Sequence, residues 1–296
     1  MEGQFMSFIV VKITDGLGNQ MFQYAYARTL QTNVYQNVYL DISDINNFRN
    51  EYALKTGWVD LCDKRNYQLD DFRITLPVID VNVLQTLKKE GFSKNRFLRY
   101  CEELRLLPTV YLSESGCRES GIRYTRFQNY YIEGNFFDKS YYVNKDNILR
   151  QEFRLKEKLN VPNRINYILK NRNTVSIHIR RGDFLKVGRN ISEGDYYLRA
   201  MDYIKNKIKS PFLFVFSDDV EWVKQNMKFD LEHFFVSGLG FSDCEELMLM
   251  SMCKNNIIAN STFSYWGAWL NCNKHKIVIV PRGWRQKIIP NSWVLI

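Results

Sequence analysis

The sequence has few of the residues that build metal and redox centres. Three histidines and six cysteines occur among 296 residues, and no two cysteines stand at C-x-x-C spacing. Several of the cysteines lie inside apolar runs, which is typical of buried free thiols in a reducing compartment. We therefore expect neither a cysteine–histidine metal site nor a disulfide framework.

Long hydrophobic runs are also missing. No stretch approaches the roughly 18 apolar residues of a membrane span. The first residues, MEGQFMSFIVVKIT, lack the basic segment and long apolar run of a signal peptide. Internal repeats, low-complexity tracts and basic tails are absent as well. A cytoplasmic location is the expectation.

The composition is that of a globular protein with an excess of positive charge. Hydrophobic residues make up 45% and charged residues 25% of the chain, enough for one large domain or two ordinary ones. The 41 Lys+Arg against 32 Asp+Glu give a net charge of +9. Such a balance favours an anionic partner: a nucleic acid, a phosphate-bearing small molecule or an anionic membrane face. Because the basic residues are scattered, a nucleic acid is the weakest of the three.

The N-terminal part opens with a βαβ pattern. The β-branched run Phe8–Thr14 predicts a buried strand, GLGNQ a glycine turn into a helix, and Val38–Ser43 a second strand. From there to about residue 145 the pattern is irregular, with candidate helices near Val81–Glu90 and Asn95–Leu107. The topology of this stretch is not assigned.

The C-terminal part alternates regularly between strands and helices. The segment Asn147–Lys170 indicates two helical stretches broken at Pro162, and we expect the domain junction there. Predicted strands follow at Thr174–Arg180, Phe212–Asp218, His233–Val236, Asn256–Asn260 and Lys276–Pro281, with helices at Tyr196–Ile208, Val220–Met227, Cys244–Cys253 and Phe263–Leu270. Apolar strands that alternate with helices predict a parallel sheet that binds ligands at the carboxyl ends of its strands.

The glycine turn after the first strand is a weak signal for a site. Gly16 and Gly18 allow close approach of a ligand to the backbone, and the following helix offers free N–H groups. Asn19 and Gln20 at the helix start are suited to hydrogen-bond sugar hydroxyls. An ordinary strand–helix turn would show the same glycines.

The end of the strand TVSIHI carries the most informative residues. Arg180 and Arg181 cannot both lie in the core, because alternation along a strand sends them in different directions. A guanidinium is suited to bidentate contact with a diphosphate, and Asp183 is placed to hold one of the two arginines. His178 lies on the same side as Arg180, so the two could form one wall of a site. A surface salt bridge beside a buried histidine is the alternative.

Acidic residues follow the strand FLFVF. Asp218 and Asp219, after Ser217, are suited to accept from ribose hydroxyls or a base edge, and at least one is expected to cap the next helix. The Asp-x-Asp spacing that binds divalent metals is absent, so no metal ligand is assigned. Asn260, Ser261 and Thr262 form a hydroxyl-rich turn into the last helix, which suits either an anion site or an ordinary N-cap. The aromatic residues behind this turn are expected to pack.

Several segments together resemble glycosyltransferase family 11, in particular its bacterial-type α-1,2-fucosyltransferases. They are GLGNQMFQYA (Gly16–Ala25), HIRRGD (His178–Asp183), FSDD (Phe216–Asp219), LMSMCKNNIIANSTFSYWGAWL (Leu249–Leu270) and the ending from IVIVPRGW to SWVLI. They run in family order from residue 8 to the C-terminus. The H-x-R-R-x-D motif alone is shared by several fucosyltransferase types, but its combination with the other segments is specific.

The resemblance implies an α/β fold of the GT-B class, with two Rossmann-like domains and the donor bound in the cleft between them. Residues 1–155 would be the acceptor-side domain with the GLGNQ loop, and residues 156–296 the GDP-fucose-binding domain. The implied reaction is inverting, metal-independent transfer of L-fucose from GDP-fucose to the 2-hydroxyl of a terminal galactose. The acceptor would be a galactose-terminated oligosaccharide or a lipid-linked glycan, with no further cofactor, no nucleic acid, and peripheral contact with the inner face of a membrane left open.

The resemblance also assigns site residues. Arg180 matches the arginine that pairs with the β-phosphate, and Glu246 stands where an aspartate is usual and is expected at the guanine edge. Asn19 is expected to orient the acceptor or the fucose, and no catalytic base is assigned. With Arg180 and Asn19 as catalytic residues, the donor-binding set is Gly16, Gly18, His178, Arg181, Asp183, Ser217, Asp218, Asp219, Glu246, Asn260, Ser261, Thr262 and Phe263.

The chain departs from the family pattern at three further positions. Asp15 replaces the usual glycine before GLGNQ, Asn255 stands where histidine is typical, and Tyr265 stands where tryptophan is usual. None of these changes removes the arginine pair, so activity is expected. Alternatives are a fucosyltransferase of another linkage or acceptor, including protein, and a non-catalytic module that binds a GDP-sugar. Charge alone would suggest a nucleic-acid-binding protein.

Overall fold

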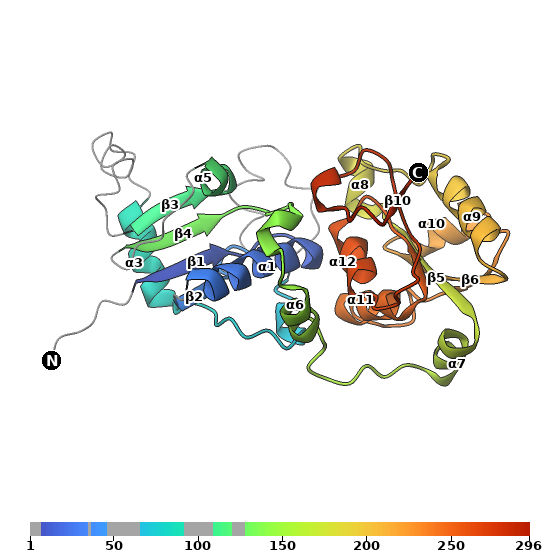
Figure 1. Cartoon of the computed structure of the whole chain (residues 1–296), viewed down its shortest axis with the longest axis horizontal. Coiled ribbons are helices and arrows are strands. Elements are labelled where there is room, and N and C mark those ends of the chain that lie inside the picture. The colour runs from blue at the N-terminus through green and yellow to red at the C-terminus, as the bar shows by residue number, and fades with distance from the viewer. Residues whose placement is uncertain (1–6, 35–36, 46–65, 92–108, 120–127) are drawn as a thin grey trace. The chain divides into compact units, whose positions relative to one another are not determined.

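The computed structural model describes residues 7–34, 37–45, 66–91, 109–119 and 128–296, and Figure 1 shows their helices and strands. The chain divides into two compact units: the described residues up to Phe153 form the first, and residues 154–296 form the second. Each unit has its own parallel sheet with helices, so the predicted α/β architecture is confirmed. The roles expected for residues 1–155 and 156–296 stay a prediction.

The first unit contains a four-stranded parallel sheet in the order β2-β1-β4-β3. Its elements are β1 (Phe8–Lys12), α1 (Leu17–Val34), β2 (Asn37–Asp41), the 3-10 turn η1 (Leu69–Asp71), α3 (Val81–Gly91), β3 (Thr109–Ser113), α5 (Glu114–Glu119), β4 (Asn129–Glu133), the 3-10 turn η2 (Lys139–Tyr142) and α6 (Asp146–Glu152). The predicted βαβ opening and the helix near Val81–Glu90 are confirmed. The helix predicted at Asn95–Leu107 lies outside the described residues.

Strand β4 was not predicted, yet it lies between β1 and β3 in the sheet. Its sequence, NYYIE, carries two tyrosines that are both buried. The Tyr131 hydroxyl donates a 2.6 Å hydrogen bond to Asp41 Oδ2, and Asp41 is itself fully buried at the end of β2. A buried polar group needs such a partner, and the bond across the sheet allows a polar strand to occupy a central position.

The second unit contains a six-stranded parallel sheet in the order β10-β9-β8-β5-β6-β7. Its elements are α7 (Asn163–Asn171), β5 (Asn173–Ile179), α8 (Gly182–Lys186), α9 (Tyr196–Lys207), β6 (Pro211–Ser217), α10 (Val220–Asn226), β7 (Glu232–Phe235), α11 (Asp243–Met252), β8 (Asn255–Ile257), α12 (Thr262–Leu270), β9 (Val278–Val280), the 3-10 turn η3 (Gln286–Ile288) and β10 (Val294–Leu295). The first strand, β5, is central. The chain builds outward to β7, returns to β8 and builds the other half, so β5 and β8 flank a topological switch point, where such sheets bind ligands.

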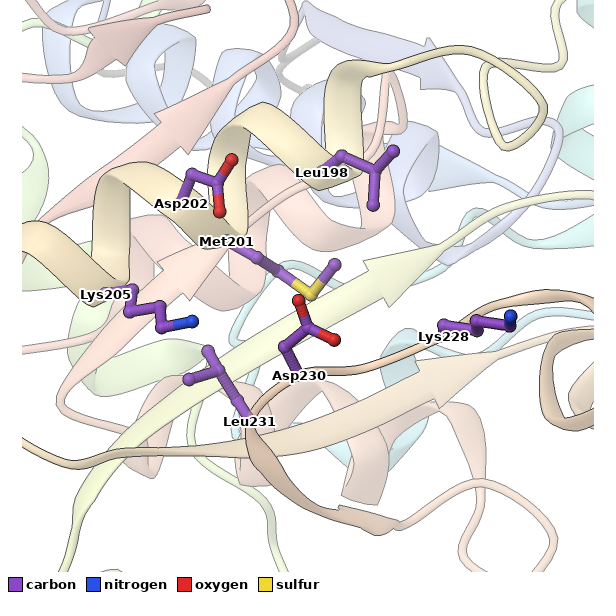
Figure 2. Close-up of a pocket in the computed structure, with 7 residues that line it drawn as sticks. All are labelled: Leu198, Met201, Asp202, Lys205, Lys228, Asp230 and Leu231. Carbon is purple, nitrogen blue, oxygen red and sulfur yellow. The ribbon is translucent and has the colours of Figure 1, made fainter.

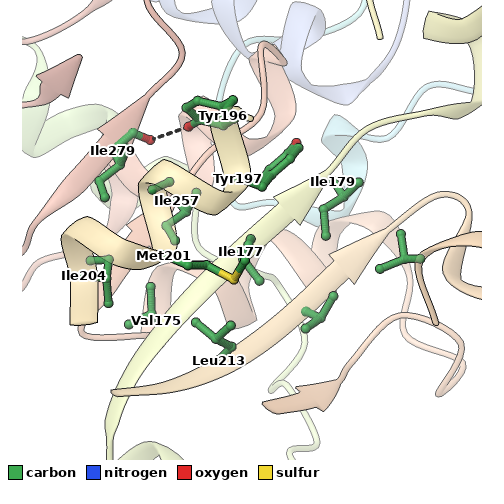
Figure 3. Packing of buried hydrophobic residues seen from close by; sticks show 13 residues of the cluster. Val175, Ile177, Ile179, Tyr196, Tyr197, Met201, Ile204, Leu213, Ile257 and Ile279 are labelled. Carbon is green, nitrogen blue, oxygen red and sulfur yellow. Dashed lines mark hydrogen bonds between the residues drawn. The ribbon is translucent and has the colours of Figure 1, made fainter. Parts of the chain in front are cut away.

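The central strand is held by a dense apolar core. Every second residue of β5 belongs to this core: Val175, Ile177 and Ile179. They pack with residues of α9, β6 and β8 (Figure 3). Each such side chain contributes about 1.5–3 kcal/mol by leaving water. The hydroxyl of the buried Tyr196 of α9 donates to the carbonyl of Ile258 at 2.6 Å and shares its hydrogen with the carbonyl of Ile279 at 3.2 Å, the contact drawn in Figure 3. Helix α9 is therefore hydrogen-bonded to the end of β8 and to β9, and it packs on the sheet. These contacts hold the carboxyl ends of the strands in place.

The break between the two helical stretches of residues 147–170 is wider than predicted. The first helical stretch ends at Glu152, well before Pro162, and α7 begins just after that proline. Phe153 follows α6 and is fully buried, with its ring 5.6 Å from that of Tyr24 and 6.0 Å from that of Phe72. This anchoring of Phe153 ends the first unit, and the break is wider than the proline alone would produce.

Candidate active site at the strand ends

Arg180 lies immediately after β5, at the edge where the carboxyl ends of the parallel strands meet. Its Nε and Nη2 donate to Asp183 Oδ1 at 3.0 and 2.7 Å, and Nη1 lies 3.0 Å from Asp218 Oδ2. The side chain is 19% exposed. These contacts engage at most three of the five N–H groups of the guanidinium, so two are left for a ligand. Two carboxylates thus orient a partly exposed cation in advance.

Arg181 points the other way, as alternation along the strand predicts. Its side chain is buried, with the guanidinium carbon 3.2 Å from the ring centre of Trp222. Nη1 donates to Ser192 Oγ at 2.6 Å and Nε to Asp219 Oδ2 at 3.2 Å. The donor-binding role expected for Arg181 stays a prediction. What the structure shows is a side chain that ties β5 to the segment before α9 and to the start of α10.

The two aspartates after β6 are both engaged by the arginine pair. Asp218 accepts from the backbone N–H of Arg181 at 2.8 Å while it pairs with the Arg180 side chain. Asp219 caps α10 by accepting from the backbone N–H of Trp222 at 3.3 Å, which confirms the predicted cap. The carboxylates therefore hold arginines and a helix end in place.

Because Gly182 has no side chain, the carboxylate of Asp218 can lie against its backbone. A Cβ at this position would lie 2.6 Å from Asp218 Oδ2, closer than real Cβ contacts come. Asp218 cannot move without releasing Arg180 and the backbone of Arg181.

We therefore expect Gly182→Ala to lower the turnover of the activity proposed below by at least about tenfold, because a misplacement of about 1 Å is costly in catalysis. Stability should fall by no more than about 1–3 kcal/mol. Steady-state kinetics and urea unfolding measure the two effects. Gly194→Ala is the matched control, because its Cβ meets only a carbonyl at 3.7 Å. Equal turnover in both variants would contradict the positioning of Arg180 by Asp218.

His178 is buried rather than part of an open wall. Burial, and secondly the positive charge of Arg180, lower its pKa to about 3, so the imidazole is neutral near pH 7. Its ring centre lies 5.4 Å from that of Phe263, and its Nδ1 has no hydrogen-bond partner. The predicted wall formed with Arg180 is corrected accordingly: His178 is buried, and of the two residues only Arg180 is partly exposed.

Glu246 is linked to the strand ends by two serines. The backbone N–H of Ser217 donates to Ser237 Oγ at 3.0 Å, and that hydroxyl donates to Glu246 Oε2 at 2.8 Å. Glu246 lies in the first turn of α11, which begins at a capping box between Ser242 and Glu245. Burial, opposed by the Ser237 hydrogen bond, raises the pKa of Glu246 to about 7. The carboxyl therefore changes its charge near neutral pH.

The turn after β8 begins helix α12. Ser261 is the N-cap and accepts from the backbone N–H of Phe263 at 3.3 Å, and Thr262 is the first helical residue. Asn260 donates to the carbonyl of Arg189 at 2.8 Å, while its Oδ1 is buried without a partner. The aromatic residues behind the turn, including Trp266, are buried and pack as predicted. This turn follows β8, the strand next to β5, and so lies at the switch point of the sheet.

The glycine turn of the first unit is shaped by Asp15. This residue has a φ of 64°, a left-handed conformation that explains why glycine is usual there. Asn19 Nδ2 donates to Asp15 Oδ2 at 3.1 Å. Gln20, however, is fully buried and donates to the carbonyls of Asp15 and Asn66 at 2.8 Å. Of the predicted pair only Asn19 is partly exposed, so Gln20 is corrected to a residue that holds the loop.

The structure brings most of the predicted site residues together in the second unit. His178, Arg180, Arg181, Asp183, Ser217, Asp218, Asp219, Glu246, Asn260, Ser261, Thr262 and Phe263 lie at the carboxyl edge of its sheet, whereas Gly16, Gly18 and Asn19 lie in the first unit.

Residues that the sequence did not single out support this edge. Tyr197 donates to the carbonyl of His178 at 2.9 Å, and Tyr196 donates to that of Ile258 at 2.6 Å. No motif marks these two tyrosines; only their position soon after HIRRGD (His178–Asp183) could have suggested them.

The other two departures from the family pattern are satisfied locally. Asn255 Oδ1 accepts from the backbone N–H of Ile277 at 2.9 Å, which ties β8 to the approach of β9. The Tyr265 hydroxyl donates to the carbonyl of Ile288 at 3.1 Å inside the core. Both residues are buried and neither adds a group to the strand-end surface.

Other features lie apart from this edge. A cavity of about 240 Å³ is bounded by α9 and the segment before β7 (Figure 2), and its charges are mixed: Lys205 and Lys228 with Asp202 and Asp230. Within the described ranges no three His, Cys, Asp or Glu residues are grouped as a metal site. None of the helices in those ranges is long and apolar enough to cross a membrane.

Comparison with known proteins agrees with this arrangement. The model of the family "Glycosyl transferase family 11" matches residues 8–288. The O-antigen biosynthesis glycosyltransferase WbnK of Escherichia coli is 33% identical, over 95% of this chain and 98% of its own. An alpha-1,2-colitosyltransferase of Escherichia coli is 30% identical, over 97% of this chain and 96% of its own.

Two solved structures show the fold. A mutant of FUT1 from Arabidopsis thaliana in complex with GDP has a TM-score of 0.53 at 13% identity, covering 99% of this chain and 77% of that one. The alpha-1,6-fucosyltransferase NodZ co-crystallised with GDP has a TM-score of 0.51 at 13% identity, covering 88% of this chain and 91% of that one. The GT-B class expected from the sequence is thereby confirmed. With its motifs, its switch-point site and a family match over nearly its whole length, the chain belongs to glycosyltransferase family 11.

Proposed function

We propose that this glycosyltransferase transfers L-fucose from GDP-fucose to the 2-hydroxyl of a terminal galactose, with inversion at the fucose carbon. The observation that carries the proposal is the geometry of Arg180, a partly exposed guanidinium fixed by Asp183 and Asp218 at the switch point. Negative charge grows on the β-phosphate as the glycosidic bond breaks. A preorganised cation stabilises that charge without having to reorganise.

The remaining strand-end residues provide contacts for the rest of the donor. The N-terminus of α12, capped by Ser261, offers backbone N–H groups and a positive helix end to the diphosphate. Glu246 offers a carboxylate that matches the adjacent N–H donors of guanine. In this proposal the base lies towards β7 and the sugar towards β8.

Metal independence is part of the proposal. All four carboxylate oxygens of Asp218 and Asp219 already accept from an arginine or a backbone N–H group, which disfavours their use as metal ligands. The guanidinium of Arg180 and the helix end then stabilise the leaving group where a divalent ion would otherwise do so.

The first unit is proposed to bind the acceptor, in line with the roles expected for residues 1–155 and 156–296. Asn19 is held by Asp15 near the start of α1 and can orient a hydroxyl through its amide. An amide is no base, so deprotonation of the acceptor is left to water or to a late proton transfer.

Product analysis tests the donor and the linkage together. The enzyme is incubated with GDP-fucose and lactose, and the trisaccharide is identified by NMR. We expect fucose on O2 of the terminal galactose. A panel of other galactosides and a glycoprotein serves as comparison, and fucose on any other position or only on protein would replace the proposed linkage.

A second donor is suggested by one relative. Because the colitosyltransferase is 30% identical over nearly the whole chain, GDP-colitose, whose sugar is fucose without its 3-hydroxyl, is an alternative. Parallel turnover measurements with the two donors decide between them. A kcat/KM at least about tenfold higher for GDP-fucose supports the proposal, as expected if the missing hydroxyl leaves a site group unpaired.

The titration of Glu246 predicts pH-dependent donor binding. The guanine N–H donors need the ionised carboxylate, whereas burial raises the pKa of Glu246 to about 7 in the free protein. Below that pKa part of the binding energy is used to remove a proton, so GDP-fucose should bind about tenfold more weakly near pH 6 than near pH 8. Calorimetry without acceptor measures this, because the diester phosphates of GDP-fucose do not titrate in this range. Glu246→Gln should bind more weakly and lose the pH dependence; an unchanged profile in that variant would remove Glu246 from the site.

A further inference from the structure

The amino-end edge of the second sheet, opposite Arg180, carries a concentration of lysines. Because all six strands are parallel, their first residues share one edge. Five connections lead into that edge: α7–β5, α9–β6, α10–β7, α11–β8 and α12–β9. Each brings at least one lysine, at the end of its helix or in the loop. Lys224 in the last turn of α10 is exposed but pairs with Glu221 at 2.7 Å. The other exposed ones are Lys170, Lys205, Lys207, Lys209, Lys228 and Lys274.

These lysines are not neutralised locally. Within residues 154–296, all of which the structure describes, no ion pair is formed by any of the six. The exposed acids nearby are Asp202, Asp230 and Glu232, and Glu232 is paired with Arg172 at 2.6 Å. Figure 2 shows Lys205 and Lys228 on opposite sides of Asp230, with Asp202 on α9. The edge therefore has an excess of positive charge that the proposed transfer reaction does not use.

Exposed apolar side chains accompany this charge. Tyr167 of α7 is 67% exposed, and Met252 at the end of α11 is 44% exposed, just before the loop that carries Lys254. Lysines with long apolar stems beside an exposed tyrosine and methionine suit the boundary between lipid headgroups and acyl chains.

A nucleic acid fits the same edge less well. The cations are lysines, which act as point charges, while the one arginine of the edge, Arg172, is paired with Glu232 and lies over the ring of Phe212. Lysines can neutralise phosphates, but base contacts favour guanidinium forks and exposed aromatic rings for stacking. Tyr167 is the one large exposed aromatic side chain of residues 154–296.

We infer that this lysine edge docks the protein on an anionic lipid surface. The occupant is a bilayer rich in acidic headgroups, held by charge and by shallow insertion of Tyr167 and Met252. Strand β5 has seven residues and so spans about 23 Å. Docking by the amino-end edge therefore leaves the strand ends with Arg180 on the far side from the lipid, open to soluble substrates. The inference does not depend on the identity of the sugar donor.

Sedimentation with lipid vesicles tests the inference on the full chain. Wild-type protein should bind vesicles of phosphatidylcholine with phosphatidylglycerol, bind pure phosphatidylcholine weakly, and lose binding as salt rises. A variant with Lys207, Lys209 and Lys274 changed to Gln should bind about a hundredfold more weakly, since each lysine contributes about fivefold. Transfer to a soluble galactoside should not change in that variant, which separates docking from catalysis.

The control variant removes the same charge elsewhere, with Lys139, Lys145 and Lys287 changed to Gln. It should bind the acidic vesicles within about threefold of wild type, because these lysines lie outside the edge. Equal losses in the two variants would show that net charge alone causes binding and would overturn the inference. So would an absence of preference for phosphatidylglycerol, or tight binding to duplex DNA without vesicle binding. Vesicle binding by a protein that shows no fucosyl transfer would instead overturn the proposed function alone.

Discussion

Arg180→Ala should lower kcat by about 10²–10³ while the protein stays folded, the loss typical of removing one preorganised donor from developing charge. Arg180 is partly exposed and lies at the surface of the strand ends, so its removal leaves the core untouched. Steady-state kinetics with GDP-fucose and lactose measure the loss, and circular dichroism verifies the fold. KM for the acceptor should change little, because the guanidinium acts on the leaving group.

Two further variants refine this expectation. Arg180→Lys should recover only a small part of the activity, since an ammonium keeps the charge but lacks the fork that fits Asp183, Asp218 and a phosphate together. Arg199→Ala is the matched control, because Arg199 forms an exposed pair with Asp195 on α9. Full turnover by a well-folded Arg180→Ala enzyme would contradict the role of this arginine.

Arg181→Ala should destabilise the second unit by about 3 kcal/mol, although its neighbour in the motif can be removed without such a cost. The substitution leaves a cavity against Trp222 and takes the partner from Asp219 and from the buried Ser192. Urea unfolding followed by tryptophan fluorescence measures the change, because five of the six tryptophans lie in residues 154–296.

Arg181→Met separates packing from charge. Methionine fills much of the space over Trp222 but cannot pair with Asp219, so it should recover roughly half of the lost stability. A stable Arg181→Ala variant with no donor binding would show that Arg181 contacts the ligand, as the sequence alone suggested. The two adjacent arginines therefore have opposite expected signatures: loss of rate for Arg180 and loss of stability for Arg181.

The second unit could be predicted from the sequence because its strands are buried on both faces. Apolar runs such as FLFVF, alternating with helical segments, predict strands of a parallel sheet. Because parallel strands all end at the same edge, the polar residues that follow these runs lie at one edge of the sheet. The predicted cap at Asp219 follows from local chemistry alone and is confirmed.

Long-range partners explain what the sequence could not show. Strand β4 was missed because tyrosines suggest an exposed segment. Tyr131 can be buried because its hydroxyl donates to Asp41, which is far away in the sequence. Gln20 looked suited to bind sugar for the same reason, since its partner Asn66 is 46 residues away in the sequence. The burial of His178 and Arg181 likewise depends on Phe263, Trp222 and Ser192, which no local pattern connects to the motif.

The most direct test of the proposed transfer is GDP release from GDP-fucose, measured with and without lactose in the presence of EDTA. We expect release that depends on the acceptor, survives EDTA and falls by about 10²–10³ in Arg180→Ala. Acceptor-dependent release that EDTA abolishes would contradict the metal-independent mechanism. Measurable GDP-fucose binding without release on any galactoside would contradict the proposed transfer itself.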